Sequence, residues 1–133
     1  MGTFNLNGRG HGTREDLSAW LIPETSRSQQ QAEIVVVGFQ EIVELSPQQI
    51  MSTDPGRRQD WEAAVAKTLN EHARKSNSEE YVLLRSGQLV GAALMVFVKS
   101  HILKSIKNVE GSVKKVSSPT LGLEPEPTSL TKC

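Results

Sequence analysis

The run Val35-Val36-Val37-Gly38-Phe39-Gln40-Glu41 decides the fold of this chain. Successive β-branched residues predict a strand, and apolar residues on both of its faces place it in the middle of a sheet. The run ends with Gln40 and Glu41, which places an amide and a carboxylate at the strand end, where loops and active sites usually lie. Two interpretations of Glu41 follow: a solvated acid at a strand end, or a buried acid that a divalent cation compensates.

Other strands are expected on both sides of this run. Period-two patterns and turn residues predict them at Thr3–Leu6, Glu80–Arg85, Leu89–Val98 and the opening of Asn108–Lys114. A turn at Ser86-Gly87 would join the second and third of these into a hairpin.

Two helices and a helical turn fill the intervening segments. One helix is expected over Glu15–Ile22, before Pro23, and a helical turn over Pro47–Ser52. The strongest helical pattern begins at Asp54-Pro55, where Asp can cap and Pro fits the first turn, and continues to Arg74. Its apolar face carries residues four apart in sequence: Trp61, Val65, Leu69 and Ala73. This face is expected to pack against the sheet.

Composition excludes several classes of protein. The chain has 133 residues, with 15 Lys+Arg and 15 Asp+Glu, so its net charge of zero provides no global field for nucleic acid. The only cysteine is Cys133, so no disulfide forms within the chain. No apolar run approaches the roughly 20 residues of a membrane helix, and no secretory signal is evident.

The segment from Ile34 to Lys115 resembles the inositol polyphosphate 5-phosphatases, nearest to the synaptojanin-like branch. The opening motif of that family, aromatic-Asn-aliphatic-Asn-Gly, is matched at Phe4–Gly8, with Phe4 where tryptophan is usual. The other matching stretches are Val36–Leu45, Gln48–Met51, Tyr81–Gly91 and Asn108–Lys115. The resemblance implies part of an α/β (α+β) fold of the endonuclease/exonuclease/phosphatase type, a β-sandwich flanked by helices. Residues 1–115 would be the N-terminal part of that catalytic domain, and residues 116–133 a disordered tail.

The resemblance implies a Mg²⁺ site at Asn5 and Glu41. In the superfamily, the first asparagine of the opening motif and the glutamate of the Phe-Gln-Glu motif help to hold the metal beside the scissile phosphate. Mg²⁺ takes oxygen ligands and is commonly held by one or two carboxylates, water and phosphate. From the residues alone, Asn5 also fits a turn-capping role before Asn7-Gly8.

Four further residues are candidates for the substrate side of the site. Gln40 would orient Glu41 or touch substrate, and His11 lies in a glycine-rich stretch near Asn5. Lys114 and Lys115 lie where the family begins a substrate-facing loop, and a solvated strand end is the alternative for both. We interpret His72 and His101, which match no catalytic histidine of the family, as structural or solvated.

The principal acid and base residues of the family lie in later motifs that this sequence does not contain. After Lys115 the chain continues into Val116-Ser117-Ser118-Pro119 instead of the family's Gly-Asn-Lys-Gly loop. We therefore expect a fragment with negligible phosphatase activity by itself, from a truncated or mis-spliced product. Without its sheet partners, it is also expected to expose apolar faces and open edges.

The expected function is that of a piece of a Mg²⁺-dependent phosphoinositide or inositol polyphosphate 5-phosphatase. The resemblance implies a cytoplasmic protein, peripheral to membranes in its full length. A non-catalytic binding or regulatory fragment is the first alternative. A nuclease of the same superfamily is the second, and zero net charge weighs against it.

Overall fold

A computed structural model describes residues 1–22, 31–48 and 54–112 of the chain. Its centre is a four-stranded mixed sheet in the order β1-β2-β4-β3. The strands are β1 (Gly2–Asn5), β2 (Ile34–Gln40), β3 (Tyr81–Leu89) and β4 (Ala92–Lys99). β1 runs parallel to β2, and the other two pairings are antiparallel. The predicted central position of the valine-rich strand is confirmed, because β2 lies between β1 and β4.

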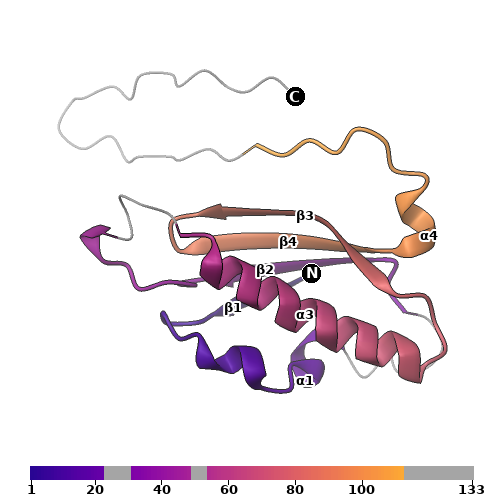
Figure 1. Ribbon diagram of the computed structural model, residues 1–133, viewed down its shortest axis with the longest axis horizontal. Coiled ribbons are helices and arrows are strands. Elements are labelled where there is room, and N and C mark those ends of the chain that lie inside the picture. The colour runs from indigo at the N-terminus through magenta and orange to yellow at the C-terminus, as the bar shows by residue number, and fades with distance from the viewer. Residues whose placement is uncertain (23–30, 49–53, 113–133) are drawn as a thin grey trace.

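The long helix α3 (Gly56–Lys75) crosses one face of the sheet, with the short helix α1 (Ser18–Leu21) beside it (Figure 1). Asp54 accepts the Gly56 amide at 2.9 Å, as expected of a residue at a helix start. The predicted apolar stripe is confirmed, since Trp61, Val65, Leu69 and Ala73 are all buried.

The core lies between α3 and the sheet. Met95 and Phe97 of β4 are fully buried there, and Val37 and Phe39 of β2 are nearly so. The Phe39 ring contacts Trp61 at a centroid distance of 4.9 Å and Trp20 at 5.6 Å. Through these aromatic contacts, α3 and α1 pack against β2, the strand that leads to Glu41.

The opposite face of the sheet is covered less completely by the described residues. Ile34 is 55% exposed and Leu94 is 51% exposed. A groove of about 570 Å³ runs over this face, between strands β3 and β4 and residues 109–112. The expectation of exposed apolar surface on this part of the sheet is therefore confirmed.

The predicted hairpin is present, but its turn was misplaced: β3 continues past Arg85 to Leu89, and β4 begins only at Ala92. Ser86 and Gly87 lie inside β3, paired with Met95 and Leu94, and the turn falls at Val90-Gly91. The Ser86 hydroxyl also donates to the Glu62 carboxylate of α3, which holds this part of the strand against the helix. Because backbone and side chain are both engaged in this way, the Ser-Gly pair continues the strand.

Two other predicted elements are shorter or different. Helix Glu15–Ile22 is reduced to α1, because Asp16 accepts the Ser18 amide at 2.9 Å and starts the helix there. A 3-10 turn, η1 (His11–Arg14), precedes it. Residues 108–112 form no strand, and the rest of Asn108–Lys114 lies outside the described residues. The same is true of most of the predicted helical turn Pro47–Ser52.

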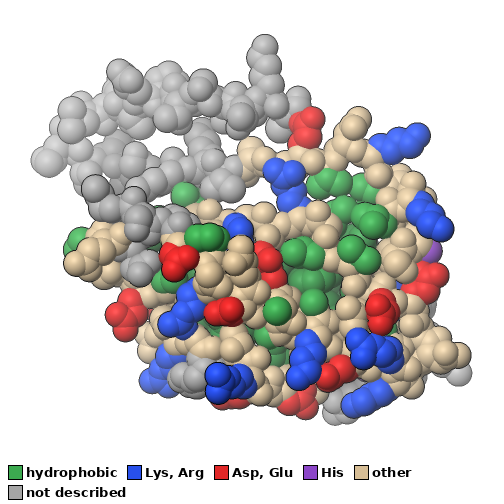
Figure 2. Space-filling model, viewed as in Figure 1, with side chains coloured by type: hydrophobic (Ala, Val, Ile, Leu, Met, Phe, Trp, Pro, Cys, Tyr) green, Lys and Arg blue, Asp and Glu red, His purple; other side chains and the backbone are tan. Residues whose placement is uncertain are grey.

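The short helix α4 (Ser100–Leu103) follows β4 directly. Within the described ranges, none of the helices combines the length and apolarity that crossing a membrane requires. Basic and acidic side chains are intermingled over the face seen in Figure 2, in keeping with the zero net charge.

Candidate functional site

Asn5 and Glu41 meet at the ends of two neighbouring parallel strands. Asn5 is the last residue of β1 and lies opposite Gln40, the last residue of β2. Parallel strands end at the same edge of a sheet, so the residue after β2 lies beside Asn5. The Asn5 side-chain amide donates a hydrogen bond of 3.0 Å to Glu41 Oε1.

The orientation of the Asn5 side chain is fixed from both ends. Its Oδ1 accepts the Asn7 amide at 2.9 Å, while its Nδ2 donates to Glu41. The turn-capping role considered for Asn5 is thus present, and the same side chain also contacts the Glu41 carboxylate. Asn5 is exposed and Glu41 is partly exposed, so solvent and small ions reach the pair.

Glu41 has an unusual backbone conformation. Its φ is 51°, in the left-handed region that residues other than Gly, Asn and Asp rarely enter. Such conformations persist only where the surrounding structure imposes them, and they cluster at functional sites. This feature could not be predicted from the residue type, because glutamate has no preference for the left-handed region.

Of the other four candidates, only Gln40 has a described side chain. Gln40 is exposed and lines the groove on the face of the sheet opposite α3, together with Thr3 and Leu94. His11 begins η1, and its side chain is not among the described atoms. Lys114 and Lys115 lie outside the described residues.

His101 has structural partners at the far end of β4. Its Nδ1 lies 2.5 Å from Glu79 Oε2, and its Nε2 lies 3.7 Å from Glu33 Oε1. The Glu79 carboxylate also accepts the His101 backbone amide at 3.0 Å. These hydrogen bonds lower the pKa of Glu79, and their geometry supports the structural interpretation of His101.

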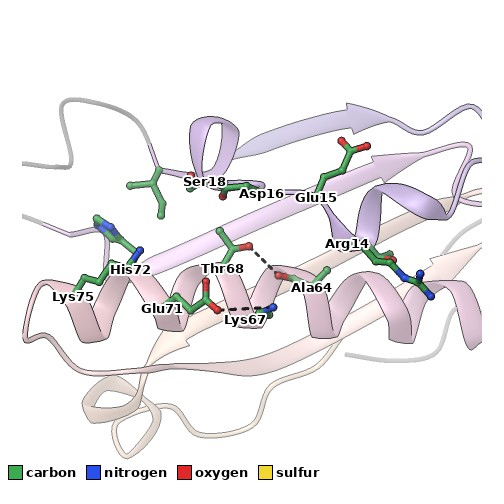
Figure 3. A pocket seen from close by; sticks show the side chains of 12 residues that line it. Arg14, Glu15, Asp16, Ser18, Ala64, Lys67, Thr68, Glu71, His72 and Lys75 are labelled. Atoms are coloured by element: carbon green, nitrogen blue, oxygen red, sulfur yellow. Dashed lines mark hydrogen bonds and ion pairs between the residues drawn. The ribbon is translucent and has the colours of Figure 1, made fainter.

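A second pocket of about 360 Å³ lies between α3 and the segment 13–22 (Figure 3). Besides His72, its lining balances three residues of each charge: Arg14, Lys67, Lys75, Glu15, Asp16 and Glu71. Lys67 and Glu71 are 3.9 Å apart and partly neutralise one another. An evenly balanced lining gives no net attraction for a polyanion, so we place the candidate site at Asn5 and Glu41.

The pair offers the Glu41 carboxylate to a metal ion, and the Asn5 amide orients that carboxylate. Among the described residues, no three His, Cys, Asp or Glu side chains gather into a metal-binding group. The donor set still fits Mg²⁺, which is often held by one or two carboxylates with water and substrate phosphates as the other ligands. It does not fit a structural zinc site, which takes four ligands from Cys, His and acidic residues.

The family can be decided by comparison with known proteins. The model of "Endonuclease/Exonuclease/phosphatase family 2" matches residues 2–122. The chain belongs to this family.

The relatives of this family member include inositol 5-phosphatases. The chain is 51% identical over 115 residues to "Inositol-1,4,5-trisphosphate 5-phosphatase 1" of Schizosaccharomyces pombe. The match covers 86% of the chain and 10% of that protein. The chain is 34% identical over 122 residues to human "Synaptojanin-2", covering 82% of the chain and 8% of that protein. The resemblance to the synaptojanin-like 5-phosphatases is confirmed. The chain spans about a tenth of the length of these curated relatives.

A solved relative shows the same fold. The crystal structure of the inositol polyphosphate 5-phosphatase domain of SPsynaptojanin, in complex with inositol (1,4)-bisphosphate and calcium ion, superposes with a TM-score of 0.68. The two chains are 50% identical, and the match covers 85% of this chain and 30% of the solved one. The predicted mixed α/β fold class of the endonuclease/exonuclease/phosphatase type is confirmed.

Two glycines adjoin Glu41, a contact that the sequence analysis did not predict for either of them. Gly8 donates its amide to the Glu41 carbonyl at 2.7 Å, and the Gly91 carbonyl accepts the Ile42 amide at 2.9 Å. The Asn7-Gly8 dipeptide is a turn signal that could have drawn attention to the first. Val90, which precedes the second, has a φ of 52° although it is β-branched, and a residue of this type does not predict a turn.

Proposed function

We propose that this chain forms the Asn5–Glu41 part of a Mg²⁺-dependent active site for hydrolysis of the 5-phosphate of a phosphoinositide or inositol polyphosphate. The observation that carries the proposal is the 3.0 Å hydrogen bond between Asn5 and Glu41 in a member of this family. A relative solved with inositol bisphosphate and calcium supports both an anionic inositol ligand and a divalent cation.

In the proposed site, Glu41 holds the metal and Asn5 orients Glu41. When bound, Mg²⁺ would polarise phosphoryl oxygens and neutralise developing charge. Glu41 supplies a single negative charge, which leaves the ion a net positive charge toward the phosphate. Asn5 directs the carboxylate through a neutral amide and adds no charge of its own. Gln40, exposed one residue before Glu41, is suited to contact a polar substrate group.

The 133 residues alone are proposed to hydrolyse no phosphoinositide at a useful rate. The acid and base residues that the family resemblance implies lie in motifs that the sequence does not contain. The loss of principal catalytic groups commonly lowers kcat by several orders of magnitude. In the full-length protein we propose a cytoplasmic location, with peripheral contact to the membrane that carries the lipid substrate.

Phosphate release tests this function in two proteins. The chain alone should give no release above buffer from an inositol phosphate with Mg²⁺. A chimera in which this chain replaces the aligned 115 residues of the S. pombe 5-phosphatase should be active, since half of those positions are identical. Glu41→Gln in the chimera should lower kcat at least about a hundredfold. A folded chimera without activity, or one that Glu41→Gln leaves fully active, would contradict the proposal.

A further inference from the structure

The left-handed backbone of Glu41 needs an external restraint. For an L residue other than glycine, this conformation costs about 1–2 kcal/mol relative to the right-handed one. Glu41 follows β2 directly, and its φ of 51° ends the strand pairing there. Its side chain reaches Asn5 from this conformation, so whatever holds the backbone also sets the direction of the carboxylate.

Three backbone hydrogen bonds hold the peptide groups around Glu41. The Gln40 carbonyl accepts the Leu6 amide at 2.8 Å, and the Glu41 carbonyl accepts the Gly8 amide at 2.7 Å. On the other side, the Ile42 amide donates to the Gly91 carbonyl at 2.9 Å. Two of the three donors thus come from the turn that follows β1, the strand that carries Asn5.

That turn has the geometry that an Asn-Gly sequence favours. The Arg9 amide donates to the Leu6 carbonyl at 2.9 Å, which closes a four-residue turn. The two central residues both have positive φ, 49° at Asn7 and 70° at Gly8. Consecutive positive φ values define a type I′ turn, in which Asn and Gly are the preferred central pair.

Gly8 also lies against the loop after β2 more closely than any other residue could. A Cβ atom at this position would lie 2.7 Å from Glu44 Cγ, 3.2 Å from the Glu44 nitrogen and 3.3 Å from its Cα. A new Glu44 rotamer could relieve the first contact, but the other two atoms belong to the backbone and would have to shift by a few tenths of an ångström. A side chain at position 8 would push apart the two segments that carry Asn5 and Glu41.

We propose that Gly8 is a positioning residue for Glu41: its lack of a side chain lets the turn after β1 bind the Glu41 carbonyl and aim the Glu41 carboxylate at Asn5. The proposal rests on the proposed function, because it assumes that Glu41 and Asn5 form a metal site. It assigns to Gly8 a role in metal affinity that a residue needed only for a turn would not have.

Mn²⁺ titration of the full 133-residue chain, followed by NMR, tests this role. Paramagnetic broadening of the Asn5 side-chain NH₂ signal and the Glu41 signals reports binding at the site without any need for activity. In Gly8→Ala, half-broadening should require at least about tenfold more Mn²⁺, the usual loss when groups that orient a ligand are disturbed. Gly8→Asn should show the same loss, because Asn tolerates a positive φ but still places a Cβ against Glu44.

The control is Asn77→Ala. Asn77 also has a left-handed backbone, with φ 50°, but lies beyond the end of α3. This change should lower stability without altering the Mn²⁺ concentration for half-broadening. Wild-type affinity in Gly8→Ala or Gly8→Asn would overturn the proposal. Absence of broadening in the wild-type chain would instead overturn the metal site itself.

A measurement on the wild-type chain covers the case in which the Gly8 variants do not fold. The hydrogen bond to Glu41 should protect the Gly8 amide from solvent exchange to about the same degree as the Leu6 amide. Rapid exchange at Gly8 beside a protected Leu6 would overturn the proposed restraint.

Discussion

Asn5 donates its side-chain amide to the Glu41 carboxylate at 3.0 Å, although 36 residues separate the two in sequence. The contact depends on the parallel pairing of β1 with β2, whose last paired residues are Asn5 and Gln40. An acid at a strand end is common, but an acid held by a neighbouring amide has a defined direction. This relationship leads to predictions about metal affinity, whereas the surrounding core and surface contacts lead to predictions about stability.

Asn5→Ala should weaken divalent metal binding about 10–100-fold, because Glu41 loses the group that orients it. The measurement is the Mn²⁺ titration of the Glu41 NMR signals. Asn70→Ala is a matched control, since Asn70 makes two hydrogen bonds to the Tyr81 backbone and its loss should affect stability alone. Equal metal affinities in the two variants would contradict the assigned role of Asn5.

Phe39→Ala should lower the free energy of unfolding by about 3–5 kcal/mol. Phe39 lies in β2, the strand that leads to Glu41. It is 2% exposed and packs on Trp61 and Trp20. Phe4→Ala is the matched control, because Phe4 pairs with Phe39 across β1 and β2 but is 50% exposed. Urea unfolding should show the larger loss for Phe39, and equal losses would contradict the described core.

Lys99→Met should destabilise the fold by about 1–3 kcal/mol through the acceptors that it leaves unpaired. Lys99 is buried, and its Nζ donates to Gln31 Oε1 at 2.6 Å, Ser78 Oγ at 2.8 Å and the Glu79 carbonyl at 2.8 Å. The comparison is Lys67→Met, which removes an exposed pair with Glu71 and should change stability by less than about 1 kcal/mol. Thermal unfolding of the two variants measures the difference.

The Glu79–His101 contact should make stability fall in acid. The pKa of Glu79 is lowered in the folded chain, chiefly by the hydrogen bond to the His101 side chain. A lowered carboxyl pKa contributes stability above the unfolded-state value of 4.5, and this contribution is lost as pH falls from there through the folded-state pKa. Glu79→Gln should flatten the stability profile in this acid range. An unchanged acid limb in that variant would count against the contact.

The sequence was sufficient to predict an element where its local pattern agrees with its burial in the fold. Val35–Val37 predicted the central strand, and the four-residue spacing from Trp61 predicted α3, because each pattern has the period of its element. The turn predicted at Ser86-Gly87 was wrong. A polar residue such as Ser86 can lie within a strand when a helix residue such as Glu62 binds it. Val90 gave no turn signal, since a β-branched residue rarely adopts the left-handed backbone that it has here.

The candidate site was predictable in its residues but not in its geometry. Motif resemblance named Asn5 and Glu41, while the hydrogen bond between them requires the parallel pairing of β1 and β2. The φ of Glu41 and the close approach of Gly8 to Glu44 arise from tertiary contacts that no local pattern encodes. For the same reason, the partners of Lys99 could not be assigned from a strand-end lysine alone.

Glu41, directed by Asn5, is the proposed metal ligand of this chain. The most direct test is Mn²⁺ titration of the wild-type chain and of Glu41→Gln, which keeps the size of the side chain and removes its charge. Selective broadening of the Asn5 side-chain NH₂ and Glu41 signals is expected in the wild type, at Mn²⁺ concentrations that leave Glu41→Gln unaffected. Broadening that is equal in the two proteins, or that centres on other acidic residues, would contradict this proposal.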